Sequence, residues 1–143
     1  MPGPWVQAAA FCDKVLQEAD GVLSLIRLVD RIVISAQSPE GAELPAELPE
    51  GGALTTTFVV MMKADDAQGR HPVTIRIQQP SGTYLEDKTV DVMFEGNDRG
   101  VNLVLNIQVP AIEGLYWFEV YINDTLVTRA PLRVMYQRIP SGA

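Results

Sequence analysis

The sequence predicts an all-β protein, and three observations lead to that prediction. Apolar residues recur in about eight short stretches between Trp5 and Tyr136, most stretches alternate with polar residues, and Gly, Pro, Asn or Asp closes each one. Alternation with a period of two places the apolar side chains on one face of a strand. We therefore expect a two-sheet antiparallel β-sandwich of about eight strands, immunoglobulin-like in type, with a flattened barrel as the alternative.

The composition fits a single domain over residues 1–143. A chain with 47% hydrophobic and 20% charged residues can bury a core without disulfides or metal, and its one cysteine cannot form an internal disulfide. The net charge of -7 disfavours nucleic acid as a partner, because that binding depends on Lys and Arg neutralising phosphates. No apolar run approaches the roughly 18 residues that span a bilayer, and the N-terminus is a poor signal peptide. We expect a cytoplasmic protein.

The first element has two interpretations. Trp5–Cys12 fits a strand, whereas residues 8–19 also fit an amphipathic helix that Gly21 would end. The next stretch, Val22–Ser35, is apolar on both faces, as in a strand covered on both sides. A Pro/Glu-rich surface loop at 37–52 follows, because its prolines prevent a regular ladder.

Six further strands complete the predicted sheets. Short turns join most of them, so we expect antiparallel pairing between neighbours. Pro131 cannot donate to a ladder, which predicts a bulge or a sheet edge in the last strand. The expected strands are Leu54–Ala64, Val73–Gln79, Leu85–Glu95, Val101–Val109, Leu115–Asn123 and Leu126–Tyr136.

Two segments carry family resemblances. The run Gly114-Leu115-Tyr116 precedes a strand that ends in the tight Asn123-Asp124 turn. This segment resembles the last hairpin of an immunoglobulin-like sandwich, in which a Gly-x-Tyr corner precedes a strand, although the inter-sheet cysteines of antibody domains are absent.

The second resemblance lies at the N-terminus. It runs from Phe11-Cys12-Asp13 through the segment 20–26 to Asp30-Arg31-Ile32 and is similar to the opening of a family of small bacterial proteins of unknown function. That resemblance implies a cytoplasmic bacterial β-sandwich and brings no activity or catalytic residues.

Residues suited to catalysis are few. His71 is the only histidine and sits beside Pro72 in a polar stretch, so we expect a solvated turn residue. Cys12 follows four apolar residues, which predicts a buried, inert thiol. The sequence contains neither a Gly-x-Ser-x-Gly elbow nor a Gly-rich phosphate loop. We expect a protein without catalytic residues or an organic cofactor.

Acidic loops suggest one metal hypothesis. If every connection reverses the chain, the first, third, fifth and seventh connections emerge at one end of the sandwich, and they include Asp65, Asp66, Asp98 and Asp124. Calcium takes about 6 to 8 oxygen ligands, but Asp and Asn also favour turns that hold no metal. Calcium-dependent or small-ligand binding at this end is the alternative function.

Aromatic residues on the outer face of one strand suggest an interface. If Tyr116 and Phe118 point inward, the opposite face of that strand carries Leu115, Trp117 and Tyr121. Aromatic residues are enriched in protein interfaces, although these three could equally lie under the proline-rich loop or the N-terminal segment. The sequence predicts a non-enzymatic interaction or structural module that contacts a protein partner or a second copy, as a self-associating chain or a subunit of a larger assembly.

Overall fold

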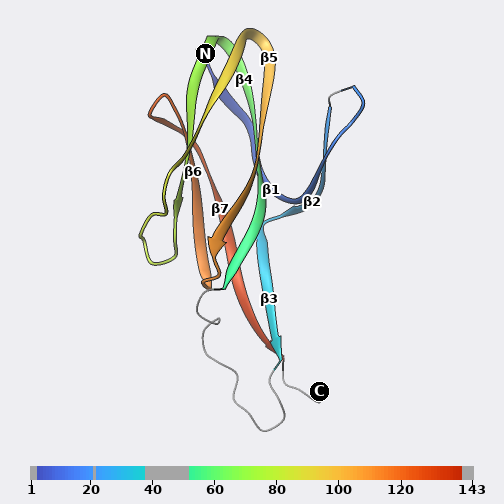
Figure 1. The fold of residues 1–143 in the computed structure, drawn as a ribbon, viewed down its shortest axis with the longest axis vertical. Helices are drawn as coiled ribbons and strands as arrows, with labels where there is room; N and C mark the ends of the chain where they lie inside the picture. Colours follow the sequence, from blue (N-terminus) through green and yellow to red (C-terminus); the bar gives the residue numbers. More distant parts are fainter. Residues whose placement is uncertain (1–2, 21, 38–51, 140–143) are drawn as a thin grey trace.

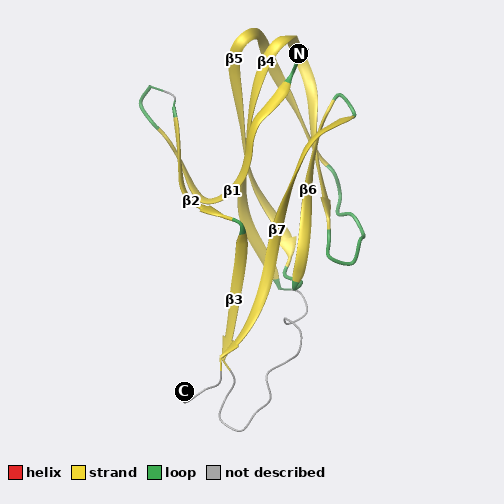
Figure 2. Ribbon diagram, turned by 180° about the vertical axis from the view of Figure 1, so that it is seen from behind, coloured by secondary structure: helices red, strands yellow, loops and turns green. Residues whose placement is uncertain are grey.

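Seven strands and no helix make up the part of the chain that the structure, a computed structural model, describes: residues 3–20, 22–37 and 52–139 (Figures 1 and 2). Consequently, none of these residues forms a helix that could cross a membrane. The predicted loop at 37–52 lies almost entirely outside the described residues. The strands are β1 (Trp5–Gln17), β2 (Leu23–Val29), β3 (Arg31–Gln37), β4 (Ala53–Gln78), β5 (Lys88–Pro110), β6 (Gly114–Ile122) and β7 (Thr125–Ile139).

The N-terminal segment is a strand and not a helix. β1 extends five residues beyond the predicted end at Cys12 and pairs antiparallel with both β2 and β4. A register shift between Val6 and Ala8 marks a bulge near its start. The predicted long strand Val22–Ser35 is wrong, because the chain bends at Asp30 and divides into β2 and β3.

Two other predicted boundaries are also wrong, because strands continue through them. Residues 54–64 and 73–78 belong to one strand, β4, and residues 88–95 and 101–109 belong to β5, while residues 79 and 85–87 of the predicted strands lie in the loop between them. β4 and β5 pair antiparallel from Ala53↔Pro110 to Ile75↔Lys88. Seven strands therefore replace the eight that were expected.

The β4–β5 pair bends in the middle instead of ending there. Its register shifts between Lys63 and Gln68, and Asp65 and Asn97, which face each other, adopt positive φ angles of 51° and 55°. Asp and Asn tolerate this left-handed conformation better than most residues, and bulges bend strands. The paired strands consequently curve over the top of the molecule (Figure 1). We call residues 63–70 and 94–100 the arch.

Because β4 bends at the arch, its two halves belong to two layers of one sheet. Before the arch, β4 pairs with β1 through residues 57–63; after it, β4 pairs with β6 through residues 73–78. The strand order is β2-β1-β4-β6-β7-β3, with β5 on the other edge of β4. The all-β prediction is confirmed, but the described strands form a single open sheet folded on itself, an arrangement between the predicted sandwich and the flattened barrel.

One strand pair departs from the antiparallel prediction. β3 runs parallel to β7, from Arg31↔Arg133 to Gln37↔Ile139. The single bend residue between β2 and β3 lets the chain pass from the edge beside β1 to the edge beside β7, and Arg133 N donates to Asp30 O at 3.3 Å. Neighbouring strands in the sequence therefore need not be neighbours in the sheet.

Three phenylalanines join the two layers. The Phe11 and Phe58 rings stack at 4.8 Å, and Phe118 from the opposite layer meets them edge-on at 4.7 and 5.2 Å. All three are at most 3% exposed. Such aromatic pairs each add about 0.5–1.5 kcal/mol beyond their buried area, so the core is anchored where β1, β4 and β6 meet.

The predicted Gly-x-Tyr corner is confirmed. The fully buried Tyr116 hydroxyl donates to Pro110 O and accepts from Ile112 N, and burial raises the pKa of that hydroxyl. Gly114 has a φ of +136°, and a Cβ there would lie 2.6 Å from the Pro80 Cβ. Glycine is required at this position by both the backbone angle and the close approach.

Tyr116→Phe should lower the free energy of unfolding by about 1–3 kcal/mol, because it removes both hydrogen bonds of a buried hydroxyl and leaves the Pro110 carbonyl and the Ile112 amide without this partner. Urea unfolding followed by circular dichroism measures the change. Trp5→Phe, at an aromatic residue 42% exposed, is the control and should cost less. An equal effect of the two changes would contradict a stabilising role for the corner.

Candidate functional site

The outer face of β6 brings the three predicted interface residues together. Tyr116, Phe118, Val120 and Ile122 are at most 3% exposed on the core side, so the alternating Leu115, Trp117, Glu119 and Tyr121 lie on the other side. Leu115, Trp117 and Tyr121 are half-buried. Side chains from β4, β7 and the loop at 79–87 surround them, and we call this surface the β6 face.

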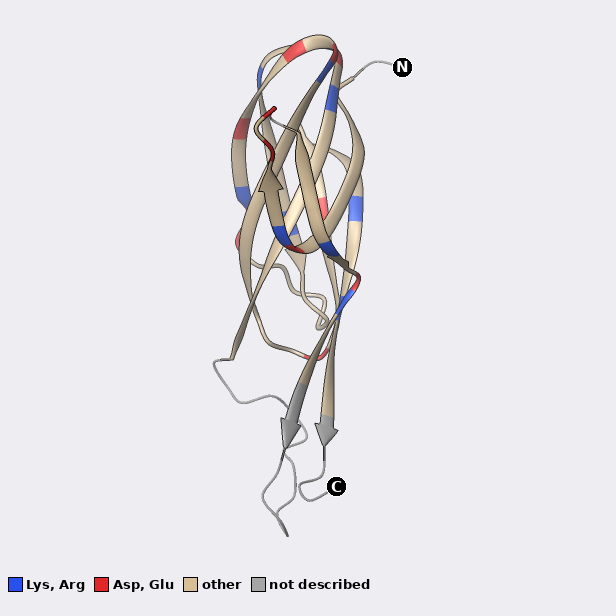
Figure 3. Ribbon diagram, turned by 90° about the vertical axis from the view of Figure 1, so that its right-hand side faces the viewer, with Lys and Arg blue, Asp and Glu red and all other residues tan. Residues whose placement is uncertain are grey.

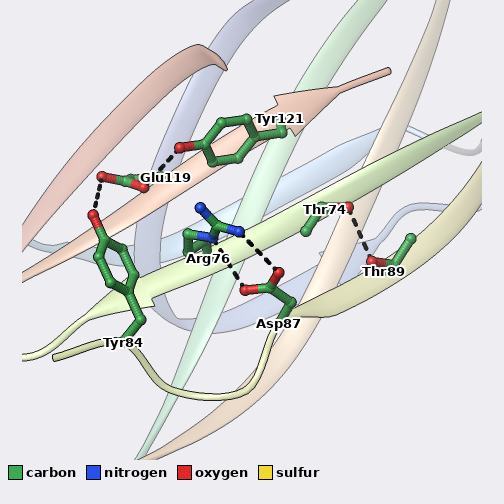
Figure 4. Close-up of polar contacts among 7 residues, drawn as sticks. All are labelled: Thr74, Arg76, Tyr84, Asp87, Thr89, Glu119 and Tyr121. Atoms are coloured by element: carbon green, nitrogen blue, oxygen red, sulfur yellow. Dashed lines mark hydrogen bonds and ion pairs between the residues drawn. The ribbon is translucent and has the colours of Figure 1, made fainter. Parts of the chain in front are cut away.

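Glu119 is the centre of the β6 face and is only 8% exposed. The Tyr84 hydroxyl donates to its Oε2 at 3.2 Å, and the Tyr121 hydroxyl donates to its Oε1 at 3.0 Å (Figure 4). Partial removal from water and the bond to Glu119 raise the pKa of Tyr84. The bond to Glu119, followed by desolvation, raises the pKa of Tyr121.

Arg76 lies between the same two tyrosines. Its guanidinium carbon is 5.5 Å from the Tyr84 ring centre and 5.4 Å from the Tyr121 ring centre. Nε and Nη2 donate to the two Asp87 oxygens at 3.3 and 3.4 Å (Figure 4). These bonds raise the pKa of Arg76 above its already high value, so the side chain is a permanent, oriented cation.

Arg129 on β7 forms a second cation–aromatic pair. Its guanidinium carbon lies 3.7 Å from the centre of the Trp117 ring. Strand register explains the arrangement, because Glu119 pairs with Arg76 on β4 and with Arg129 on β7. One carboxylate thus stands between two arginines in a row across three strands.

A polar hollow of about 380 Å³ adjoins this cluster. Thr74 and Thr89, whose hydroxyls are 2.9 Å apart, lie on one side of it, and Figure 4 shows them next to the Arg76–Asp87 ion pair. The lining residues are Thr74, Arg76, Asp87, Thr89, Tyr121 and Asp124. This surface offers hydrogen bonds, aromatic planes and fixed charges for recognition.

Alternation in the sequence predicted only the β6 residues of this surface. Arg76 could have been found, because it alternates with Val73, Ile75 and Ile77 and therefore faces outward like Tyr121. Tyr84 could not be found by alternation, because it lies in a loop.

The four aspartates of the calcium hypothesis are only partly brought together. Asp65 and Asp98 both lie in the arch, and Figure 3 shows acidic and basic positions side by side at the top of the molecule. Asp66 accepts a hydrogen bond from Gly3 N at 2.6 Å, and Asp124 lines the polar hollow beside Arg76. The described part of the chain has no group of three or more His, Cys, Asp or Glu that could hold a metal ion. Calcium binding by these loops stays a prediction.

Cys12 lies on β1 and His71 on β4. Cys12 is 2% exposed, pairs with Thr57 and Leu28, and burial raises the pKa of its thiol. His71 is half-buried within β4 and not in a turn as expected. Its Nδ1 lies 2.8 Å from Asn123 Nδ2 and its Nε2 lies 3.0 Å from Gln68 O, so both ring nitrogens are hydrogen-bonded.

Comparison with known families places the chain. Residues 7–135 match the family described as "Family of unknown function (DUF6941)". The chain belongs to the DUF6941 family. This confirms the resemblance to a family of unknown function.

Comparison with individual proteins adds structural neighbours of this DUF6941 protein. Among proteins of curated function, none matches it. It is similar to a solved structure, an immunoglobulin-like protein (PA1606) from Pseudomonas aeruginosa, with 13% sequence identity and a TM-score of 0.45 over 92% of this chain and 96% of that one.

Ionisation of Tyr84 and Tyr121 should destabilise the β6 face at alkaline pH. Because folding raises both pKa values, their contribution to stability is complete below the unfolded value of about 10 and is lost as the pH rises through the folded values. Glu119→Gln removes the negative charge and should shift tyrosine ionisation to lower pH, measured by phenolate absorbance. Identical titration curves for wild type and variant would contradict this assignment.

Proposed function

We propose that this protein is a non-enzymatic interaction module that binds a partner protein through the β6 face. The observation that carries the proposal is the row Arg76–Glu119–Arg129, flanked by Trp117 and the two tyrosines, on an outer sheet face. Arg, Trp and Tyr are the residues that most often dominate binding energy in protein interfaces.

The rigidity of the β6 face supports a protein partner. Each of its long side chains is held by another: Trp117 by Arg129, and Tyr84 and Tyr121 by Glu119. Side chains that are already ordered lose little conformational entropy on binding. The surface is therefore preorganised, and its mixture of charge and aromatic planes suits a partner with both carboxylate and apolar groups.

The placement of the chemically reactive groups supports a non-enzymatic role. Cys12 is a buried thiol on β1, whereas His71 is bound on both ring nitrogens after the arch. A nucleophile needs a base within hydrogen-bond reach, and these two residues belong to different strand pairings.

Trp117→Ala should weaken partner binding at least tenfold, because it removes the largest aromatic plane and releases Arg129. The measurement is quantitative capture from extracts of the cells that make the protein, followed by titration of the purified partner against each variant. Met93→Ala, at a residue 46% exposed on β5, is the matched control. A partner captured equally by wild type and Trp117→Ala would contradict binding through the β6 face.

A further inference from the structure

The second half of β5 has one unpaired edge. β5 pairs with β4 along its length, and no other described strand pairs with it. The backbone amides and carbonyls of an edge strand can pair with another chain. We propose that the segment Val101–Val109, which we call the β5 edge, pairs antiparallel with the same segment of a second copy of this chain.

The two halves of β5 differ in charge. The first half carries Lys88, Asp91 and Glu95, and Arg99 is ion-paired with Glu95 at 2.9 Å. The segment Val101–Val109 contains no charged residue and ends at Pro110. Natural edge strands carry charges or proline where pairing must be prevented. Charged residues therefore protect the first half of β5 against pairing. The second half lies between Arg99 and Pro110 but contains neither a charged residue nor a proline.

The core is incomplete along the β5 edge. Leu105, Leu103 and Val101 pair with Phe58, Val60 and Met62 on β4. The β4 residues are at most 1% exposed, whereas the β5 residues are only partly buried. A strand added beside β5 would cover these apolar side chains, so the edge offers burial as well as backbone hydrogen bonds.

The sequence of the β5 edge favours a second copy over a foreign peptide. About Leu105 the segment is nearly symmetric in chemical type: Leu103 matches Ile107, Asn102 matches Gln108, and Val101 matches Val109. A two-fold interface requires each residue to face its counterpart reciprocally. With the axis at Leu105, apolar residues face apolar residues on the core side; on the outer side Asn102 faces Gln108, and Val104 faces Asn106.

The other edge beside β1 is less suited to pairing. β2 pairs only with β1 among the described strands, but Arg27 has a φ of 59° and an ion pair with Asp13 at 2.9 Å. A positive φ at a long side chain interrupts the regular ladder. A kinked and charged edge discourages strand addition.

A hollow of about 420 Å³ lies along the first part of the β5 edge. Its lining comes from both halves of β5 and from the tip of the β1–β2 hairpin: Met93, Glu95, Arg99, Gly100, Val101, Asn102, Val104, Gln17 and Leu23. In the proposed register, residues 107–109 of the second copy would enter this space. The geometry thus leaves room for an added strand.

Cysteine cross-linking tests the register directly. Facing residues of antiparallel strands have Cα atoms about 4.5–5.5 Å apart, within disulfide reach. In a Cys12→Ser background, Leu105→Cys should give a covalent dimer on mild oxidation. A mixture of Asn102→Cys and Gln108→Cys chains should cross-link, whereas Met93→Cys should not. Failure of both expected cross-links, or equal cross-linking of Met93→Cys, would overturn the register.

Solution mass provides the second test. Light scattering over a hundredfold range of concentration should show a monomer–dimer equilibrium, and Val104→Lys should weaken it at least tenfold. Leu126→Lys is the matched control, because Val104 and Leu126 are 40% and 47% exposed and Leu126 lies on β7, which does not pair with β5. A monomer throughout the range, or a dimer unchanged by Val104→Lys, would overturn the proposal. A dimer lost in Trp117→Ala but kept in Val104→Lys would place self-association on the β6 face instead.

Discussion

The continuous hydrogen-bonded ladder between β4 and β5 is the constraint on which the rest of the structure depends. β5 occupies one edge of β4 throughout, so β1 and β6 must share the other edge, one on each side of the arch. The bend at the arch therefore brings Phe58 before it and Phe118, through β6, after it into one core. Without the bend, the same pairings would give a long flat sheet with an exposed apolar side.

The β6 face follows from that arrangement by strand register. β6 lies between β4 and β7, so an outward residue on β6 has an outward neighbour on each side. Glu119 in the central strand therefore stands between Arg76 on β4 and Arg129 on β7, while its carboxylate accepts hydrogen bonds from Tyr84 and Tyr121. Strand residues set the row of charges, and Tyr84 and Asp87 from the loop at 79–87 complete it, which gives a partner a constant pattern to recognise.

Periodicity predicted local features well and predicted connections poorly. The inward row from Tyr116 to Ile122, the outward row containing Trp117, and the Gly-x-Tyr corner are confirmed, because each depends only on alternation or a short contact. The boundaries near Asp65 and Asn97 were wrong because the residues that close a turn also allow a bulge. The parallel pairing of β3 with β7 depends on contacts distant in sequence, which alternation does not report.

The close approach of Gly114 to Pro80 couples the buried Gly-x-Tyr corner to a surface loop. Pro80 begins the loop that carries Tyr84, and that loop is further held by Leu85 N donating to Ile77 O at 2.9 Å. The loop is thus fastened to the corner that organises the core. A substitution that moves the Gly-x-Tyr corner would also move the loop that carries Tyr84. We therefore expect the corner and the β6 face to vary together in evolution, even though the corner residues need not contact the binding partner.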